Sequence, residues 1–275
     1  MSLRIGTAGV PHSSSKGSTL SGIKRIKELG LTAMEIEWVR GVRMGDQLAS
    51  EIKTLSNNLD IHLSAHGPYW INLNSQDESK LQKSIERVLN TARKGNTCGC
   101  KTVTFHPAYY LKQDPKKVYD FVKKQLEFIS NKMDEEEIKL RVSLETTGKV
   151  SQFGTVEEIV SLSKEIKNIW PCIDFAHLYA RSLGKINSYE DFSKVLDTIE
   201  NGLGKKGIKN MHIHLSGIAY GNTGERNHLN LPDAKINYKA VLKALKDYKA
   251  EGILICESPN LEEDALLIQK AYESL

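Results

Sequence analysis

Eight short apolar segments typical of β-strands alternate with eight amphipathic segments typical of α-helices, and together they fill the chain. The predicted strands cover residues 3–8, 33–38, 61–66, 101–106, 139–145, 170–174, 208–215 and 252–257. The predicted helices cover residues 18–29, 46–57, 77–95, 114–131, 155–167, 188–201, 237–249 and 261–273. Parallel strands joined by helices in this number favour a closed (β/α)₈ TIM barrel, built as a single domain over residues 1–275.

Residues typical of helix N-caps support this alternation. Asp114 precedes a proline, and Thr155 and Ser188 each stand three residues before an acidic residue. The alternative architecture is an open, doubly wound sheet, but no glycine-rich dinucleotide-binding turn follows the first strand. We therefore favour the closed barrel.

Composition sets broad limits on the partners. The chain has 38 lysines and arginines against 34 acidic residues, a net charge of +4, which favours an anionic partner but is also common on ordinary surfaces. The four cysteines form no C-x-x-C pair, so we expect reduced, structural thiols. No apolar run reaches the roughly 18 residues that cross a bilayer, and no basic leader is present. We expect a cytoplasmic protein without membrane contact.

Six consecutive predicted strands end in a histidine or a carboxylate. These residues are His66, His106, Glu145, Asp174, His214 and Glu257. Side chains alternate along a strand, and here aliphatic residues share one face while Thr, Ser, Arg and His share the other, which would put a polar set inside the barrel. Three imidazoles and three carboxylates around one mouth favour a divalent-metal site, with Zn²⁺ first and Mn²⁺ or Fe²⁺ as alternatives.

Each of these residues also has a simpler interpretation. A single histidine at a strand end is more often a packing residue than a ligand, and Asp174 could cap the following helix. The repetition on six strands is what favours the metal cluster. His212 lies one pleat deeper than His214, where a supporting or core role is the better interpretation.

Charged residues outside this set are harder to assign. Glu35 and Glu37 share a face that could be the barrel interior. Glu37 could be a further ligand or a base, although we favour an ion pair with Arg4 or Arg141. Other arginines follow strands and could contact phosphates at the mouth. The candidates for such substrate contacts are Arg40, Arg181 and Arg226.

Motifs around the strand ends resemble the endonuclease IV family of apurinic/apyrimidinic endonucleases, within the wider xylose isomerase-like barrels. The matching segments, in the order of the family, are Ala65-His66-Gly67-Pro68-Tyr69, Phe105-His106-Pro107, Leu144-Glu145-Thr146-Thr147-Gly148, Cys172-Ile173-Asp174 with His177, His214-Leu215 and Cys256-Glu257-Ser258-Pro259. The combination is specific, whereas the first two strands match only loosely.

The resemblance implies a metal-dependent endonuclease that hydrolyses the phosphodiester 5′ of abasic sites in DNA with a zinc-activated hydroxide. His66 and His106 would hold one zinc, Glu145 would bridge it to a second, and the second site would be completed by Asp174, His214 and Glu257. Glu145, Asp174 and Glu257 would be the catalytic residues, and Tyr69 would contact the substrate unless it only packs at the mouth. DNA with abasic sites would be the partner, and no obligate protein partner is implied.

The family holds a third zinc with a histidine after strand six and an Asp-x-His in the loop after strand seven. His177 is present, but the loop reads Gly224-Glu225-Arg226-Asn227-His228. Either the loop shifts so that Glu225 and His228 coordinate, or third-metal binding is altered, weakened or absent, and we favour this second alternative. Two zinc ions are therefore expected, and the third stays open.

A sugar isomerase or epimerase is the main rival function. It would use one divalent metal on Glu145, Asp174, His214 and Glu257, with Glu145 and Glu257 as the acid/base pair. The pair His66 and His106, which such a site does not need, favours the nuclease. A non-catalytic DNA- or metal-binding relative is the third alternative.

Overall fold

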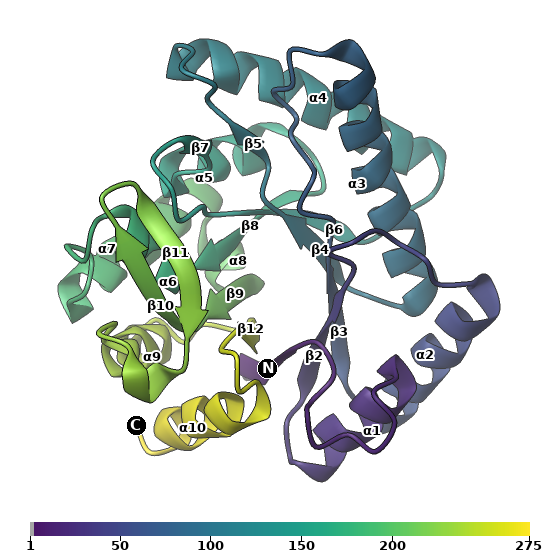
Figure 1. Ribbon diagram of the computed structural model, residues 1–275, viewed down its shortest axis with the longest axis vertical. Helices are drawn as coiled ribbons and strands as arrows, with labels where there is room; N and C mark the ends of the chain where they lie inside the picture. The colour runs from purple at the N-terminus through teal and green to yellow at the C-terminus, as the bar shows by residue number, and fades with distance from the viewer. Residues whose placement is uncertain (1–2) are drawn as a thin grey trace.

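The structure is a computed structural model that describes residues 3–275. Eight parallel strands close into a barrel in the order β1-β12-β9-β8-β6-β4-β3-β2 (Figure 1), which confirms the predicted (β/α)₈ fold. The barrel strands are β1 (Leu3–Ala8), β2 (Ala33–Glu37), β3 (His62–His66), β4 (Thr102–Phe105), β6 (Arg141–Glu145), β8 (Ile169–Asp174), β9 (Met211–Leu215) and β12 (Gly252–Cys256). Each strand lies next to its predecessor along the chain, so their carboxyl ends meet at one mouth.

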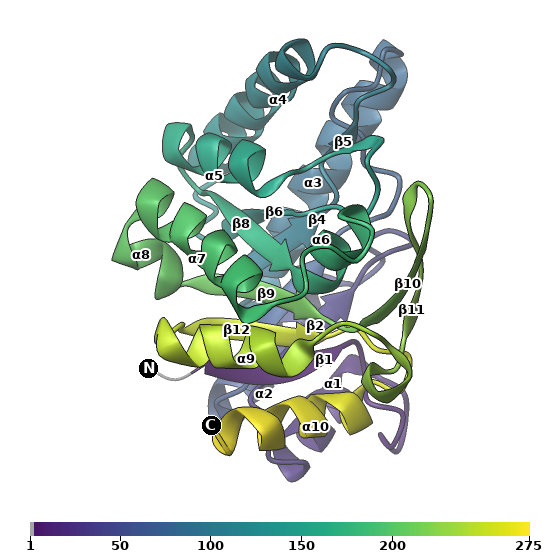
Figure 2. The same cartoon turned by 90° about the vertical axis from the view of Figure 1, so that its left-hand side faces the viewer.

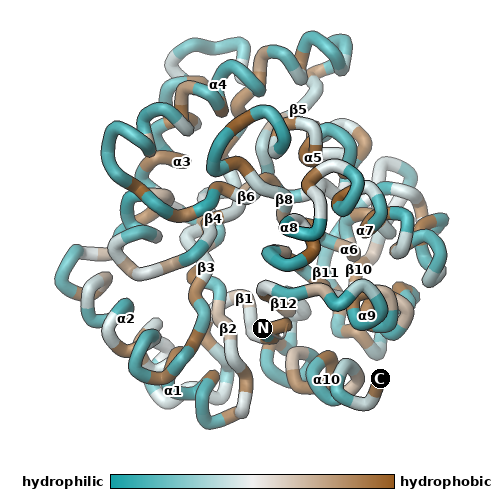
Figure 3. The backbone as a smooth tube through the Cα atoms, turned by 180° about the vertical axis from the view of Figure 1, so that it is seen from behind, coloured by the Kyte–Doolittle hydropathy of each residue, from teal (hydrophilic) through white to brown (hydrophobic). Residues whose placement is uncertain are grey.

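Helices surround the barrel. The long ones are α1 (Thr19–Glu28), α2 (Asp46–Leu59), α3 (Glu78–Cys98), α4 (Pro115–Glu135), α5 (Val156–Glu165), α7 (Tyr189–Leu203), α9 (Tyr238–Asp247) and α10 (Glu262–Glu273). The three predicted caps are present, because the side chains of Asp114, Thr155 and Ser188 each accept a backbone N–H of the following helix. Seen from behind (Figure 3), these helices alternate between hydrophilic and hydrophobic stretches, as expected for helices with one face on the barrel.

The strand faces divide as predicted. Leu63, Val103 and Ile213 are buried in the large core that the strands share with the helices. On the opposite face, the hydroxyl oxygens of Thr102 and Ser143 lie 2.7 Å apart inside the barrel. The four cysteines are all buried and unpaired. The barrel interior is therefore polar toward the mouth, while the structural apolar core lies between the strands and the helices.

Short elements occupy loops for which the sequence predicted no regular structure. They are β5 (Ala108–Tyr109) paired with β7 (Gln152–Phe153), α6 (Phe175–Arg181), α8 (Lys205–Ile208), the hairpin β10 (Gly217–Gly221) with β11 (Gly224–Leu229), and the 3₁₀ turn η1 (Leu231–Asp233). Ile208, the first residue of the predicted strand 208–215, is instead the last residue of α8, and β9 starts later than predicted, at Met211. Figure 2 shows the hairpin on the side of the molecule toward which the arrow of β8 points.

One glycine fixes the hairpin to the loop after β6. Gly224 has φ of 102°, and a Cβ there would lie 2.2 Å from the Gly148 carbonyl oxygen, so only glycine fits. The backbone N–H of Glu225 donates to that same carbonyl at 2.9 Å. The hairpin is thereby held over the mouth of the barrel. Among the described residues, no helix combines the length and apolarity that crossing a membrane requires.

Candidate metal centre

The six strand-end residues converge at the mouth. His66, Glu145 and Asp174 are the last residues of β3, β6 and β8, and His106 and Glu257 directly follow β4 and β12. His214 is the penultimate residue of β9. Their donor atoms fall into two groups, within each of which all atoms lie within 4.8 Å of one another: His66, His106 and Glu145 in the first, and Glu145, Asp174, His214 and Glu257 in the second.

Glu145 lies between the two groups, with one carboxylate oxygen toward each. Its Oε2 is 3.1 Å from Nε2 of His66 and 3.2 Å from Nε2 of His106. Its Oε1 is 3.3 Å from Nδ1 of His214, which is also 3.2 Å from Oε1 of Glu257. Because Glu145 is fully buried, this carboxylate can act only within the cluster. Its geometry is that of a bridging ligand.

A third donor group comprises His177, Glu225 and His228, whose donor atoms also lie within 4.8 Å of one another. His177 belongs to α6, whose first turn is capped by Asp174, since Oδ1 of Asp174 accepts the backbone N–H of His177 at 2.7 Å. Nε2 of His177 lies 3.6 Å from Oε2 of Glu225. The capping interpretation of Asp174 is thus correct, and its other oxygen still faces the cluster.

A β-bulge in the hairpin gives Glu225 and His228 a common face. The pairing of β10 with β11 shifts between Ala219 and Tyr220, so that Arg226 has no partner residue. In a regular strand, residues three apart point to opposite faces, and one extra residue reverses this. The geometry of this loop corresponds to the alternative in which a shift brings Glu225 and His228 together as possible ligands.

Hydrogen-bond partners determine which nitrogen of each ring is free. In three histidines Nδ1 lies beside a backbone carbonyl oxygen, which can only accept a hydrogen bond. Nδ1 therefore carries a proton, and Nε2 is the nitrogen whose lone pair can bind a metal. The distances from Nδ1 are 2.7 Å to Gly67 for His66, 2.9 Å to Thr146 for His177 and 3.0 Å to Glu257 for His228. His214 is reversed, because its Nδ1 faces the carboxylates of the cluster.

Without a cation, protonated imidazoles balance the buried carboxylates. Burial raises the pKa of Glu145, but His106 and His214 outweigh it and hold the pKa of that carboxyl well below its usual value. Burial lowers the pKa of His66, yet the hydrogen bond to Glu145 raises it to about 10. For Glu257, burial dominates and holds the pKa well above its usual value. The cluster therefore retains protons that a cation would displace.

Buried polar atoms without a hydrogen-bond partner test whether a cation fits. Those in the cluster include Oδ2 of Asp174, Oε2 of Glu257 and Nε2 of His177. Leaving such groups unpaired is costly, and cations in the second and third donor groups would satisfy these three atoms. Mixed nitrogen and oxygen donors suit a divalent metal. The residues therefore fit a metal-dependent site.

A cavity of about 290 Å³ opens above these donors. Its wall includes Tyr69 and Lys149, and Tyr69 is 61% exposed at the rim. Arg40, three residues after β2, and Arg226, within β11, are both exposed. These three predicted substrate-contacting residues are thus available to a ligand.

The predicted substrate contact of Arg181 needs correction. Its Nη1 donates to the hydroxyl of Thr147 at 3.0 Å, to the Gln152 carbonyl at 2.9 Å and to the Lys149 carbonyl. The guanidinium therefore holds the loop after β6 in place. Because that hydrogen-bonding capacity is directed at the protein's own backbone, we no longer expect Arg181 to contact a phosphate.

The expected ion pair of Glu37 with Arg4 or Arg141 is wrong. Arg4 pairs with Asp60 at 3.0 Å, and Arg141 donates to a backbone carbonyl at 3.1 Å at the other end of the barrel. Glu37 instead lines the cavity, and its Oε1 is buried without a partner. Burial raises the pKa of Glu37 to about 7 against the opposing influence of His66.

Comparisons with known proteins agree with this fold. Residues 23–275 match the family model described as xylose isomerase-like TIM barrel. The chain is 47% identical over 273 residues to an uncharacterized protein of Methanocaldococcus jannaschii, covering 99% of this chain and 98% of that one. It is 27% identical over 265 residues to a protein of Methanosphaera stadtmanae named "Probable endonuclease 4", covering 89% of this chain and 92% of that one.

Solved structures show the same barrel with different activities. Endonuclease IV from Thermus thermophilus superposes with a TM-score of 0.71 at 20% identity, over 98% of each chain. A D-tagatose 3-epimerase-like protein superposes equally well, with a TM-score of 0.71 at 20% identity over 98% of this chain and 96% of that one. At this identity the likeness supports the fold alone. The chain belongs to the xylose isomerase-like TIM barrel family.

Proposed function

We propose that the protein is a metal-dependent phosphodiesterase that cuts DNA on the 5′ side of abasic sites. The observation that carries the proposal is the presence of three donor groups, two of which share Glu145. A sugar isomerase with one divalent cation requires only the group of Glu145, Asp174, His214 and Glu257. In such an isomerase the other buried histidines and carboxylates of the cavity would have no cation to bind, and burying them would cost free energy of folding.

The residues take roles that follow from their geometry. Nε2 of His66 and Nε2 of His106 would bind a first cation, and Glu145 would join it to a second. Asp174, His214 and Glu257 would complete the second site, and His177, Glu225 and His228 would hold a third cation. Zn²⁺ fits this donor set best, with Mn²⁺ or Fe²⁺ as alternatives. Bound cations would polarise the phosphoryl group and acidify a bound water.

The cavity and its rim suit a nucleic acid. A volume of about 290 Å³ is suitable for one sugar phosphate, so the rest of a polynucleotide would lie outside. Tyr69, which lines the cavity, is 61% exposed, and its neighbour Trp70 is 58% exposed, so these two rings could stack on bases beside the lesion. Lys149, Arg40 and Arg226 would contact backbone phosphates.

A sugar epimerase is the second candidate, and one observation favours it. The pKa of Glu257 is raised by burial while the pKa of Glu145 is held low by His106 and His214 despite burial. Two carboxyl groups whose pKa values are driven apart are typical of an acid/base pair. The superposition on a D-tagatose 3-epimerase-like protein is compatible with this alternative.

One experiment separates the two functions. Zinc-loaded protein is incubated with duplex DNA carrying a single tetrahydrofuran abasic analogue, and in parallel with a ketohexose. We expect a nick 5′ of the analogue and no epimer. Glu145→Gln should lower the nicking rate at least about 100-fold, the scale of losing one transition-state contact. Glu127→Gln is the control, because this α4 carboxylate is 50% exposed and, within residues 3–275, has an ion pair only with Lys123 at 3.9 Å.

The result that overturns the proposal is an intact duplex together with epimer formation that Glu145→Gln abolishes. Nicking that persists unchanged in Glu145→Gln would contradict the assigned role of that residue and point to a contaminating nuclease. His106→Ala gives a further distinction, because only the nuclease mechanism requires the first donor group.

A further inference from the structure

A second layer of polar residues lies directly beneath the donors. Oε1 of Glu35, on β2, is 2.9 Å from Nε2 of His214, and Oε2 of Glu35 is 2.9 Å from Nε2 of His212. Glu35 and His214 are fully buried, and His212 is 2% exposed. Since β1 and β12 separate β2 from β9 in the barrel, these contacts cross the interior. One carboxylate thus holds two rings of the same strand.

The outer nitrogen of His214, Nε2, faces a carboxylate that belongs to none of the donor groups. The outer nitrogens of His66 and His228 face backbone carbonyls, and Nδ1 of His177 faces the Thr146 carbonyl but also lies 3.2 Å from Oε1 of Glu145 and 3.3 Å from Oδ2 of Asp174. With a cation bound by Glu145 and Glu257 on the other side of the ring, the negative charge of Glu35 would favour the remaining proton of His214 on Nε2 and leave the lone pair on Nδ1. Nδ1 is the nitrogen that faces Glu145 and Glu257 at 3.3 and 3.2 Å.

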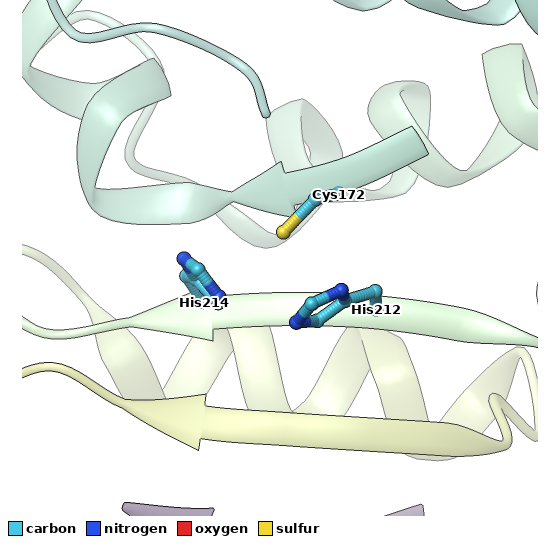
Figure 4. A group of neighbouring side chains, drawn as sticks. All are labelled: Cys172, His212 and His214. Carbon is cyan, nitrogen blue, oxygen red and sulfur yellow. The ribbon is translucent and has the colours of Figure 1, made fainter. Parts of the chain in front are cut away.

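The same histidines form another candidate metal site with Cys172. Figure 4 shows Cys172 of β8 pointing toward His212 and His214 of β9, and their donor atoms lie within 4.8 Å of one another. However, Glu35 occupies Nε2 of both rings, and Nδ1 of His214 faces the mouth, so the histidines offer only Nδ1 of His212. Burial raises the pKa of the Cys172 thiol to about 12, which disfavours the thiolate a metal would need.

We propose that Glu35 is a positioning residue of the metal centre, whose carboxylate keeps the proton of His214 on Nε2 and so fixes Nδ1 as the metal-binding nitrogen. His212 is the second support of that carboxylate. The inference rests on the metal centre of the proposed function, and it does not depend on DNA as the substrate. Removing such a supporting carboxylate from a ligand histidine typically weakens metal binding about 10- to 100-fold.

The balance of charge in this layer agrees with the assignment. Burial raises the pKa of Glu35, but His214 and His212 outweigh it and hold the pKa well below its usual value. Burial lowers the pKa of His212. Within residues 3–275, both ion-pair contacts of Glu35, each at 2.9 Å, are with histidines of β9, while Arg4 pairs with Asp60 and Arg141 donates to the Asn210 carbonyl.

The first test needs no variant. Long-range ¹H–¹⁵N correlation spectra of the zinc-loaded, ¹⁵N-histidine-labelled protein assign the proton and the metal on each ring nitrogen. His214 should have a protonated Nε2 and a zinc-bound Nδ1, whereas His66 should have the reverse pattern. A His214 that binds zinc through Nε2 overturns the proposal whether or not any variant folds.

The second test measures metal affinity by competition with a chelator, using Zn²⁺ alone and no DNA. Glu35→Ala should weaken the binding of one zinc equivalent about 10- to 100-fold, and Glu35→Gln, which keeps one acceptor oxygen, should have a smaller effect. Glu262→Gln is the matched control, because this glutamate is 7% exposed but accepts backbone N–H groups of His12 and Ser13. Folded Glu35→Ala protein with unchanged zinc affinity contradicts the proposal.

The two proposals fail differently. If zinc-loaded protein does not cut abasic DNA but His214 has the expected proton and zinc pattern, the substrate assignment is wrong and the role of Glu35 stands. If DNA is cut but the pattern on His214 is reversed, the role of Glu35 is wrong and the nuclease stands.

Discussion

Metal affinity should increase with pH, because the metal-free cluster holds protons on the nitrogens that bind metal. The pKa of His66 is raised to about 10 by Glu145 despite burial, and its Nδ1 proton is used by the Gly67 carbonyl. At pH 8, two units lower, about 99% of metal-free molecules would carry the displaceable proton on Nε2 of His66. Each proton displaced makes the apparent affinity rise about tenfold per pH unit.

From pH 7 to pH 9 this reasoning gives an increase of about 90-fold from His66 alone. His214 adds to it, since Cys172 and Glu257 raise its pKa well above the usual value against the effect of burial. The assay is competition between the protein and a chelator of known proton affinity, together with calorimetry in two buffers of different ionisation enthalpy. A zinc affinity that stays constant between pH 7 and pH 9, or binding without proton release at pH 8, would refute the reasoning. His66→Asn should reduce the slope by about one proton.

Three further predictions concern His66, Glu37 and His228. The raised pKa of His66 stabilises the metal-free protein fully below the usual histidine pKa of about 6.5, and this stabilisation is lost as pH rises through about 10. Between these pH values the Tm of the metal-free protein should therefore fall more than the Tm of the zinc-loaded protein. Glu37→Gln should raise the Tm of metal-free protein most above pH 7, because burial raises the pKa of Glu37 to about 7, and the gain should vanish below about pH 4.5; equal gains at pH 4 and pH 8 would contradict this. His228→Ala should remove one zinc equivalent, measured by elemental analysis after dialysis, and leave the others bound; Asn227→Ala, at an exposed neighbouring position, is its control.

The barrel and the meeting of six strand-end side chains at one mouth were predictable because they depend on local sequence, whereas the division of those side chains into two donor groups was implied by the family resemblance. Alternation along each strand fixes which side chains face inward, and the closed order of strands brings their ends together. The positions of His66, Glu145 and Asp174 at the mouth of the barrel could therefore be predicted from the fold alone.

Contacts that cross the barrel were not predictable in the same way. Glu35 and Glu37 share an inward face, but whether each meets an arginine at the bottom or a histidine at the top depends on the stagger of strands that are far apart in sequence. The third donor group depends on a bulge, for which the residues Glu225 to His228 carry no local signal beyond the unusual spacing. Arg181 shows the remaining difficulty, since a cation after a strand can serve a substrate or a loop.

The bulge at Arg226 also makes the third donor group sensitive to chain length rather than to residue identity. Arg226 has no partner on β10, so many side chains can replace it at little cost to pairing. Deleting it, in contrast, would restore regular pairing and bring Glu225 and the histidine into an Asp-x-His-like spacing of two residues. A spacing of three residues with a bulge and a spacing of two residues without one would therefore both direct a carboxylate and a histidine toward His177. An alignment that compares residues position by position would score the three-residue spacing as a missing metal site.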